Sequence, residues 1–453
     1  MAGADLVIWS RRVVAADATL AAAVVIQAGQ IAAVEPAADA GAALAVAGGA
    51  ELIALADDEV LLPGLVDTHV HVNEPGRTDW EGFATATSAA AAGGITTLID
   101  MPLNSLPPTV DAVALAAKRA AAASQAHVDV GFWGGAVPGN FAERAALHQA
   151  GVFGFKCFTV DSGVPEFPPL DDTGLRDALA GLAALGSVLI VHAEAAAVIA
   201  GAPAAGGRDY AGFLRSRPDA AETEAIARLL TLAGQAGCRV HVLHLSSAQA
   251  VPLIAAARER GVAVTAETCP HYLSLAAEDI PAGATQFKCC PPIRGRDNRE
   301  ELWAALRAGI IDCVVSDHSP CPPALKRLSD GDFGAAWGGI SSLQLTLPVT
   351  WSQARSRGCT PADLARWMAS EPARIAGLAG KGSIAPGMDA DLVAFAPDEQ
   401  FTVRGEQLRH RHSLTPYEGQ ALHGAVRRTW LRGSPVKAGR PAGRLLSRQG
   451  AAA

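Results

Sequence analysis

Nearly continuous apolar runs alternate with amphipathic segments along the middle of the chain. The runs fall at residues 65–72, 95–101, 128–134, 152–158, 188–192, 239–245, 263–269 and 312–316. Between them, segments such as 111–125, 220–236 and 247–260 place apolar residues at helical spacing. Runs that are apolar throughout are typical of parallel strands buried on both faces. Eight such strand–helix units over about 300 residues predict an α/β fold, a (β/α)8 barrel of the TIM type.

An open, doubly wound α/β sheet would give the same alternation. That fold usually carries a glycine-rich phosphate-binding turn after its first strand. No such fingerprint follows residues 65–72. We therefore favour the barrel.

Short β-branched runs separated by turn signals occupy both ends of the chain. They fall at residues 5–9, 12–14, 23–26 and 30–34, and again at 382–384, 391–395 and 425–430. Because matching strands flank a different middle, we expect a composite β-sandwich domain of residues 1–61 and 379–453 beside a barrel of residues 62–378. The Gly-, Arg- and Ala-rich tail from Lys437 onward is expected to fray.

Composition narrows the class of protein. With 453 residues, of which 50% are hydrophobic and 18% charged, the chain can bury a large core, which excludes wholesale disorder. A net charge of −8 without basic clusters argues against nucleic acid as a partner. No apolar run clearly reaches the roughly 20 residues that span a bilayer, and residues 1–14 lack the features of a secretory signal. The 8 scattered cysteines indicate reduced thiols, so we expect a cytoplasmic protein.

The first predicted barrel strand ends in two histidines, in Asp67-Thr-His69-Val-His71. Side chains alternate along a strand, so these two imidazoles point to the same side. That arrangement allows both to bind one metal ion. On its own, the motif is equally compatible with two histidines packed in a core.

Four more candidate residues lie at the ends of later predicted strands. They are Lys156, His192, His244 and Asp317. Barrel enzymes build their active sites at the C-terminal ends of the strands. Four histidines, one lysine and one aspartate are therefore expected to converge on one rim of the barrel.

Lys156 needs a separate explanation, because an ammonium group repels cations. Burial between Phe155 and Phe158 should lower its pKa and favour the neutral amine. A neutral amine can add carbon dioxide to give a carbamate, an anion whose two oxygens can bridge two metal ions. The alternative is an ordinary buried ion-pair partner.

Together these residues resemble the cyclic amidohydrolases of the amidohydrolase superfamily, and the resemblance covers nearly the whole chain. It includes the segment Lys381-Gly-Ser-Ile-Ala-Pro-Gly-Met-Asp-Ala-Asp-Leu392, which is similar to the family's return to its β-sandwich domain. The resemblance implies two divalent metal ions, usually zinc, and a frequent homotetramer. It also implies a ligand set: His69, His71 and Asp317 for one ion, His192 and His244 for the other, and a carboxylated Lys156 that bridges both.

Within the family, several stretches are most similar to the allantoinases. They include Asn73-Glu-Pro-Gly-Arg77, Met101-Pro-Leu-Asn104, Glu267-Thr-Cys-Pro-His-Tyr272 and Trp337-Gly-Gly-Ile340. This resemblance implies that a metal-bridged hydroxide opens the hydantoin ring of allantoin to allantoate, with Asp317 as general base and acid and no organic cofactor. The alternatives are a hydantoinase, dihydropyrimidinase or dihydroorotase, or a metal-free scaffold related to this barrel.

Two departures from related enzymes concern the substrate. Asn73 stands where dihydroorotases carry a carboxylate-binding arginine, which suits a substrate without a carboxylate. Cys290 stands where relatives commonly have a serine before Pro-Pro. Asn73, Cys290 and Gly339 are the candidate substrate contacts.

Overall fold

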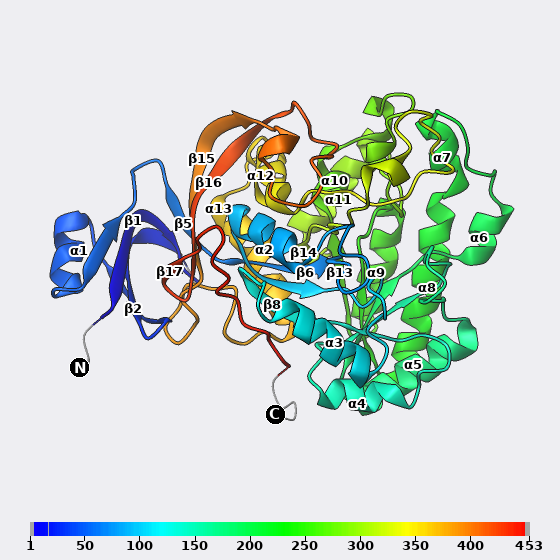
Figure 1. Ribbon diagram of the computed structural model, residues 1–453, viewed down its shortest axis with the longest axis horizontal. Helices are drawn as coiled ribbons and strands as arrows, with labels where there is room; N and C mark the ends of the chain where they lie inside the picture. Colours follow the sequence, from blue (N-terminus) through cyan, green and yellow to red (C-terminus); the bar gives the residue numbers. More distant parts are fainter. Residues whose placement is uncertain (1–3, 17, 449–453) are drawn as a thin grey trace.

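The apolar runs in the middle of the chain form the parallel strands of a barrel (Figure 1), in a computed structural model that describes residues 4–16 and 18–448. The strands are β6 (Leu65–Val70), β7 (Ile95–Asp100), β8 (Asp129–Phe132), β9 (Gly134–Gly135), β10 (Phe155–Phe158), β11 (Val188–His192), β12 (Arg239–Val242), β13 (Val264–Thr268) and β14 (Cys313–Val314). Only Trp133 separates β8 from β9, so the two continue one strand position. A parallel bridge between His318 and Val70 closes the ring. The predicted TIM-type barrel is confirmed.

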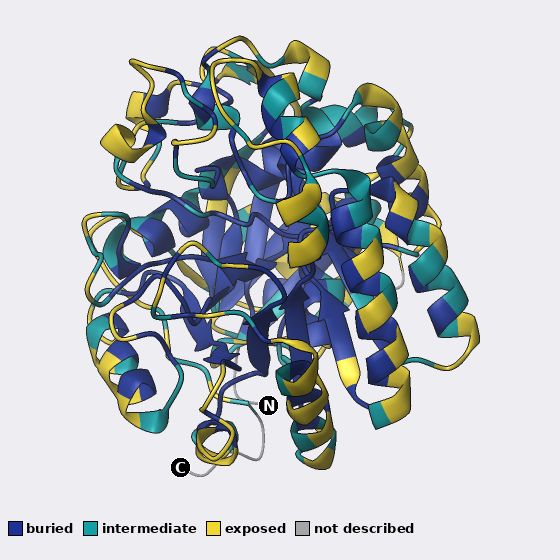
Figure 2. Ribbon diagram, turned by 90° about the vertical axis from the view of Figure 1, so that its right-hand side faces the viewer, coloured by how far each residue is buried: buried dark blue, intermediate teal, exposed yellow. Residues whose placement is uncertain are grey.

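Helices cover the outside of the barrel. They are α2 (Phe83–Ala92), α3 (Ala112–Ala122), α4 (Glu143–Gln149), α5 (Asp172–Ala184), α6 (Ala196–Gly201), α7 (Tyr210–Ser216), α8 (Asp219–Ala236), α9 (Val251–Glu259), α10 (Pro270–Ser274), α11 (Arg296–Arg307), α12 (Thr346–Arg355), α13 (Pro361–Ala365) and α14 (Glu371–Ala376). Figure 2 shows buried strands at the centre and helices whose exposed faces point outward. Burial on both faces explains why these strands are rich in apolar residues and do not alternate between apolar and polar positions.

Strands from both ends of the chain form a second sheet. They are β1 (Leu6–Val14), β2 (Thr19–Gln27), β3 (Gln30–Pro36), β4 (Glu51–Ala54), β5 (Val60–Pro63), β15 (Leu392–Thr402), β16 (Ala421–Leu431) and β17 (Ser434–Pro435), and α1 (Ala40–Ala47) packs against the sheet. Antiparallel pairing of β5 with β15 joins the two ends. The expectation that the termini build one sheet is confirmed.

Two expectations at the C-terminal end are wrong. Residues 382–384 form no strand, because Gly382 turns the chain at φ +86° and a Cβ there would lie 2.5 Å from the Ala369 carbonyl oxygen. The tail is not frayed between Lys437 and Arg448. It lies along β8, where Val130 N donates to Arg444 O and Leu446 N donates to Val130 O. Residues 449–453 lie outside the described residues.

A buried ion cluster joins the terminal sheet to the barrel. Lys381 Nζ lies 2.6 Å from Asp129 of β8 and 2.7 and 2.8 Å from Asp391 and Asp389. Arg432, which follows β16, also pairs with Asp129 at 2.6 Å. The three aspartates could otherwise hold a cation, and Lys381 supplies that charge itself.

Among the described residues, no helix combines the length and apolar character needed to cross a lipid bilayer.

Candidate active site

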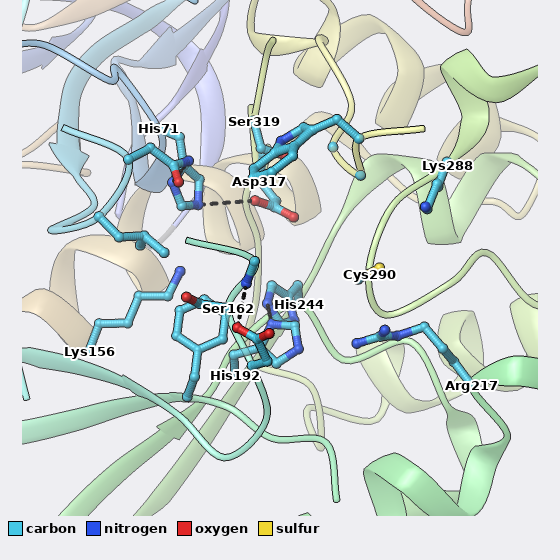
Figure 3. Close-up of a pocket in the computed structure, with 18 of the residues that line it drawn as sticks. His71, Lys156, Ser162, His192, Arg217, His244, Lys288, Cys290, Asp317 and Ser319 are labelled. Carbon is cyan, nitrogen blue, oxygen red and sulfur yellow. Dashed lines mark hydrogen bonds and ion pairs between the residues drawn. The ribbon is translucent and has the colours of Figure 1, made fainter. Parts of the chain in front are cut away.

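The six residues predicted as metal ligands lie together at the C-terminal ends of the barrel strands, and Figure 3 shows five of them around one cavity. His69 belongs to β6, Lys156 to β10 and His192 to β11, whereas His71, His244 and Asp317 lie one to three residues beyond the ends of their strands. Each is at most 6% exposed. His69 lies behind the cavity wall, since the other five line the cavity and it does not.

His69, His71 and Asp317 form the first group of possible ligands. Asp317 Oδ1 lies 3.3 Å from His69 Nε2 and 3.7 Å from His71 Nε2. Burial raises the pKa of Asp317. The backbone of Asp317 has a positive φ of 41°, a conformation that is uncommon for non-glycine residues and is over-represented at functional sites.

His192 and His244 form the second group. His192 Nδ1 and His244 Nε2 face each other at 3.0 Å. His192 Nε2 donates to Glu194 Oε2 at 2.7 Å, which leaves a lone pair on His192 Nδ1. Burial lowers the pKa of both histidines, so the neutral, ligating form is favoured.

Glu267, at the end of β13, supports both groups. It pairs with His69 Nδ1 and with His241 Nε2, the latter at 3.0 Å, and it accepts a hydrogen bond from the His244 backbone N at 3.2 Å. Burial opposes ionisation, but the two imidazoles hold the pKa of Glu267 at about 2. Sequence reasoning missed this role, although Glu267 opens one of the motifs that carry the family resemblance.

Lys156 lies between the two groups. Its Nζ is 3.5 Å from His69 Nε2 and 5.0 Å from the centre of the Phe158 ring. No carboxylate among residues 4–16 and 18–448 lies within ion-pair distance of this nitrogen. Burial lowers the pKa of Lys156 to about 8.

The donor set fits divalent cations. Two imidazole nitrogens 3.0 Å apart can share one ion, since metal–nitrogen bonds of about 2.1 Å span that gap. Carboxylates that hold the far nitrogens of ligating histidines are the usual second layer of such sites, and Glu194 and Glu267 have that place here.

The cavity has a volume of about 270 Å³, which suits a ligand smaller than a drug-sized molecule. Of the three candidate substrate contacts, Cys290 and Gly339 line it. Gly339 must be glycine, because its φ is +127° and a Cβ would lie 2.1 Å from the Ser319 carbonyl oxygen. Asn73 does not line the cavity: it is fully buried and its Nδ2 donates to Pro320 O at 3.3 Å.

Two cations that sequence reasoning missed also line the cavity, Arg217 and Lys288. Arg217 makes a bidentate ion pair with Glu194 at 3.0 and 2.6 Å. Lys288 donates to the carbonyl oxygens of Gly334 and Ala336. The uncharged Asn73 therefore does not by itself explain a preference for substrates without a carboxylate.

Comparisons with known proteins agree with this geometry. A family model described as the amidohydrolase family matches residues 60–436. The chain is 56% identical over 453 residues to an allantoinase from Streptomyces avermitilis, covering 99% of this chain and 100% of that protein. It is 49% identical over 382 residues to an allantoinase from Saccharomyces cerevisiae, covering 83% and 82%. Among solved structures, an L-hydantoinase (dihydropyrimidinase) from Arthrobacter aurescens superposes with a TM-score of 0.89 at 32% identity, over 98% of this chain and 100% of that one.

Proposed function

Because the chain belongs to the amidohydrolase family, we propose that it hydrolyses a ring amide of allantoin and thereby opens the hydantoin ring to allantoate. One observation carries this substrate: the relatives named allantoinases are far more similar in sequence to this chain than the hydantoinases of known structure. The geometry supports the reaction class, since it brings metal-ligating histidines and a carboxylate to one wall of a small buried cavity.

Divalent metal use follows from the family and from the His and Asp cluster. His69, His71 and Asp317 would hold one ion, and His192 and His244 a second. Bound there, such ions polarise a carbonyl oxygen and lower the pKa of water toward 7. We propose zinc for both positions, because imidazole nitrogen and carboxylate oxygen are donors that zinc accepts.

Lys156 is the proposed bridge, as a carbamate. A free ammonium between two cation sites would repel both ions, and no carboxylate among the described residues pairs with it. Addition of carbon dioxide forms an N–C bond and releases a proton. The lysine thereby becomes an anion with two oxygen donors, which matches its place between the two histidine pairs.

Asp317 is the proposed proton carrier. It lines the cavity, and its Oδ1 lies toward both histidines of the first group. Its carboxylate takes a proton from the attacking water, whose oxygen bonds to the ring carbonyl carbon. When the ring C–N bond breaks, the same carboxylate returns the proton to the departing nitrogen.

A panel of ring-opening assays tests this substrate. The zinc-loaded protein is incubated with allantoin, hydantoin, dihydrouracil and dihydroorotate, and kcat/KM is measured for each. We expect allantoin to be preferred by at least about a hundredfold, because the other rings lack the ureido arm and leave polar groups of the site unpaired. Faster turnover of dihydrouracil, hydantoin or dihydroorotate would assign the chain to one of the alternative enzymes.

Three further proposals concern the whole molecule. The domain boundaries are residues 1–61 and 379–453 for the terminal sheet domain and 62–378 for the barrel. A homotetramer is supported by the family resemblance alone. A cytoplasmic location is supported by the eight cysteines, all of which are free thiols.

A further inference from the structure

Lys288 is a nearly buried cation in the cavity wall that has no carboxylate partner. Its exposed fraction is 8%, and its Nζ lies 5.2 Å from the centre of the Phe213 ring. The ammonium donates to Gly334 O at 3.2 Å and to Ala336 O at 2.5 Å. No Asp or Glu in the part of the chain that the structure describes lies within ion-pair distance of it. An ammonium has three hydrogens, so one remains for a partner in the cavity.

The other cations of this region are satisfied by the protein itself. Arg217 is neutralised by its bidentate contact with Glu194. Lys326 is 4% exposed and does not line the cavity. Its ammonium donates to the carbonyl oxygens of Lys288, Trp337 and Gly339, which occupies all three hydrogens. Lys288 therefore differs from both neighbours, because it faces the cavity and keeps a hydrogen unused.

The position of Lys288 decides which part of a substrate it can reach. In Figure 3 Lys288, Cys290 and Arg217 lie on one side of the cavity, and Lys156 and His71 lie on the other. The reacting ring amide must lie at the wall that carries the histidines and Asp317. A substituent on the ring therefore extends toward the wall that carries Lys288.

We propose that Lys288 is a specificity-determining residue, whose free N–H donates to the carbonyl oxygen of the ureido arm of allantoin. This inference rests on the proposed function and adds the residue that distinguishes allantoin from rings without the arm. A neutral carbonyl is a suitable partner, because it completes the hydrogen bonding of the ammonium just as the two protein carbonyls do. A nearly buried donor without an acceptor is costly, so a ligand without a carbonyl there binds less well.

The test compares Lys288→Met with Lys326→Met, its matched control. Both variants remove a lysine that holds the same loop, but only Lys288 faces the cavity. Each zinc-loaded protein is assayed with allantoin and with 5-isobutylhydantoin, which has the same ring and an arm of similar shape without the carbonyl. Where turnover of the second compound is slow, its competitive Ki replaces KM.

Lys288→Met should raise KM for allantoin by about 10- to 100-fold with little change in kcat, and should not weaken binding of 5-isobutylhydantoin, because the donor that this compound leaves unpaired is gone. Lys326→Met should affect both compounds to the same degree. The deciding quantity is the ratio of kcat/KM for the two compounds. If Lys288→Met is insoluble, Lys288→Gln, which keeps a donor for the loop, is judged by the same ratio and should lower it at least about threefold.

The outcomes separate the two proposals. A wild-type protein that does not open allantoin removes the proposed function, and the inference with it. If the wild type opens allantoin but Lys288→Met or Lys288→Gln leaves the ratio unchanged, the inference alone is overturned and Lys288 is only a support for the loop.

Discussion

Replacement of Glu267 by Gln should weaken metal binding at both proposed positions. Glu267 takes hydrogen bonds from three N–H groups, those of His69, His241 and the His244 backbone. A Gln side chain has one acceptor oxygen and an NH2 group, so at least one of these donors would face another donor. Loss of a hydrogen bond to a charged group costs about 1.5–3 kcal/mol. Since about 1.4 kcal/mol is a factor of ten, metal affinity should fall by about 10- to 150-fold.

Metal binding should become weaker because the substitution changes the favoured tautomer of His69. When Glu267 accepts from Nδ1, the lone pair of His69 is on Nε2, which faces Asp317. An amide NH2 at that place favours the opposite tautomer and puts a proton on Nε2. Losses of about 10- to 100-fold are typical when such carboxylates are changed.

The measurement is a competition titration with a chromophoric chelator, accompanied by metal analysis of the purified protein. Glu222→Gln is the control, because Glu222 is equally buried but pairs with Arg294 and the backbone of Ser246. We expect that control to lower stability without weakening metal binding. Zinc affinity within twofold of wild type for Glu267→Gln, or equal losses in both variants, would refute the reasoning.

Two further predictions concern Lys156 and the ion cluster at the sheet. Lys156→Ala should lower kcat by about a thousandfold and leave fewer than two zinc ions per chain, since no neighbour replaces the bridging anion. A variant with two zinc ions per chain and normal turnover would contradict the carbamate. Lys381→Met should lower the free energy of unfolding by about 3–5 kcal/mol, because Asp391 is left buried and unpaired. The exposed pair of Arg11 and Asp57 is the comparison. Arg11→Met should lower the free energy of unfolding, measured with denaturant, by less than about 1 kcal/mol. If both variants lose the same free energy, burial of the cluster does not add to its effect on stability.

Much of the barrel was predictable, because its strands are short runs rich in apolar residues and differ clearly from the amphipathic helices. The terminal sheet was harder to predict. Helix α1 (Ala40–Ala47) consists of Ala, Gly, Leu and Val without a polar face, so no periodicity marks it. Its signals lie at its ends, where the Asp39 side chain accepts from Ala42 N and Gly48 adopts a left-handed conformation, and the helix packs against β1 and β2. The tail from Lys437 has a composition typical of a loose end. It is held instead by backbone hydrogen bonds to β8, which depend on the path of the chain and not on side-chain type.

The candidate ligands were predictable for a topological reason. In a parallel barrel all C-terminal strand ends meet at one rim, so His69, His192 and Asp317 come together whatever the details of packing. The supporting groups do not follow from that rule. Glu267 reaches His69 of β6 from β13, across the interior of the barrel, and a sequence does not show that contact. Lys288 is in a loop, and from sequence alone a loop lysine is expected at the surface with its charge in water.

Substrate choice must therefore be sought in the loops and not in the strands. The ring amide is common to allantoin, hydantoin and dihydrouracil, so the histidines and Asp317 cannot distinguish them. The rest of the cavity lining comes mostly from loops, which supply Leu103 and Asn104, Asp161 to Gly163, Lys288 and Cys290, and Ala336 to Gly339. Lys326 and Lys288 hold the last two of these loops together by donating to backbone carbonyls, and Lys326 does so without facing the cavity. Related barrels can thus keep the reaction and change the substrate by changing only the loop side chains that contact the substituent of the ring.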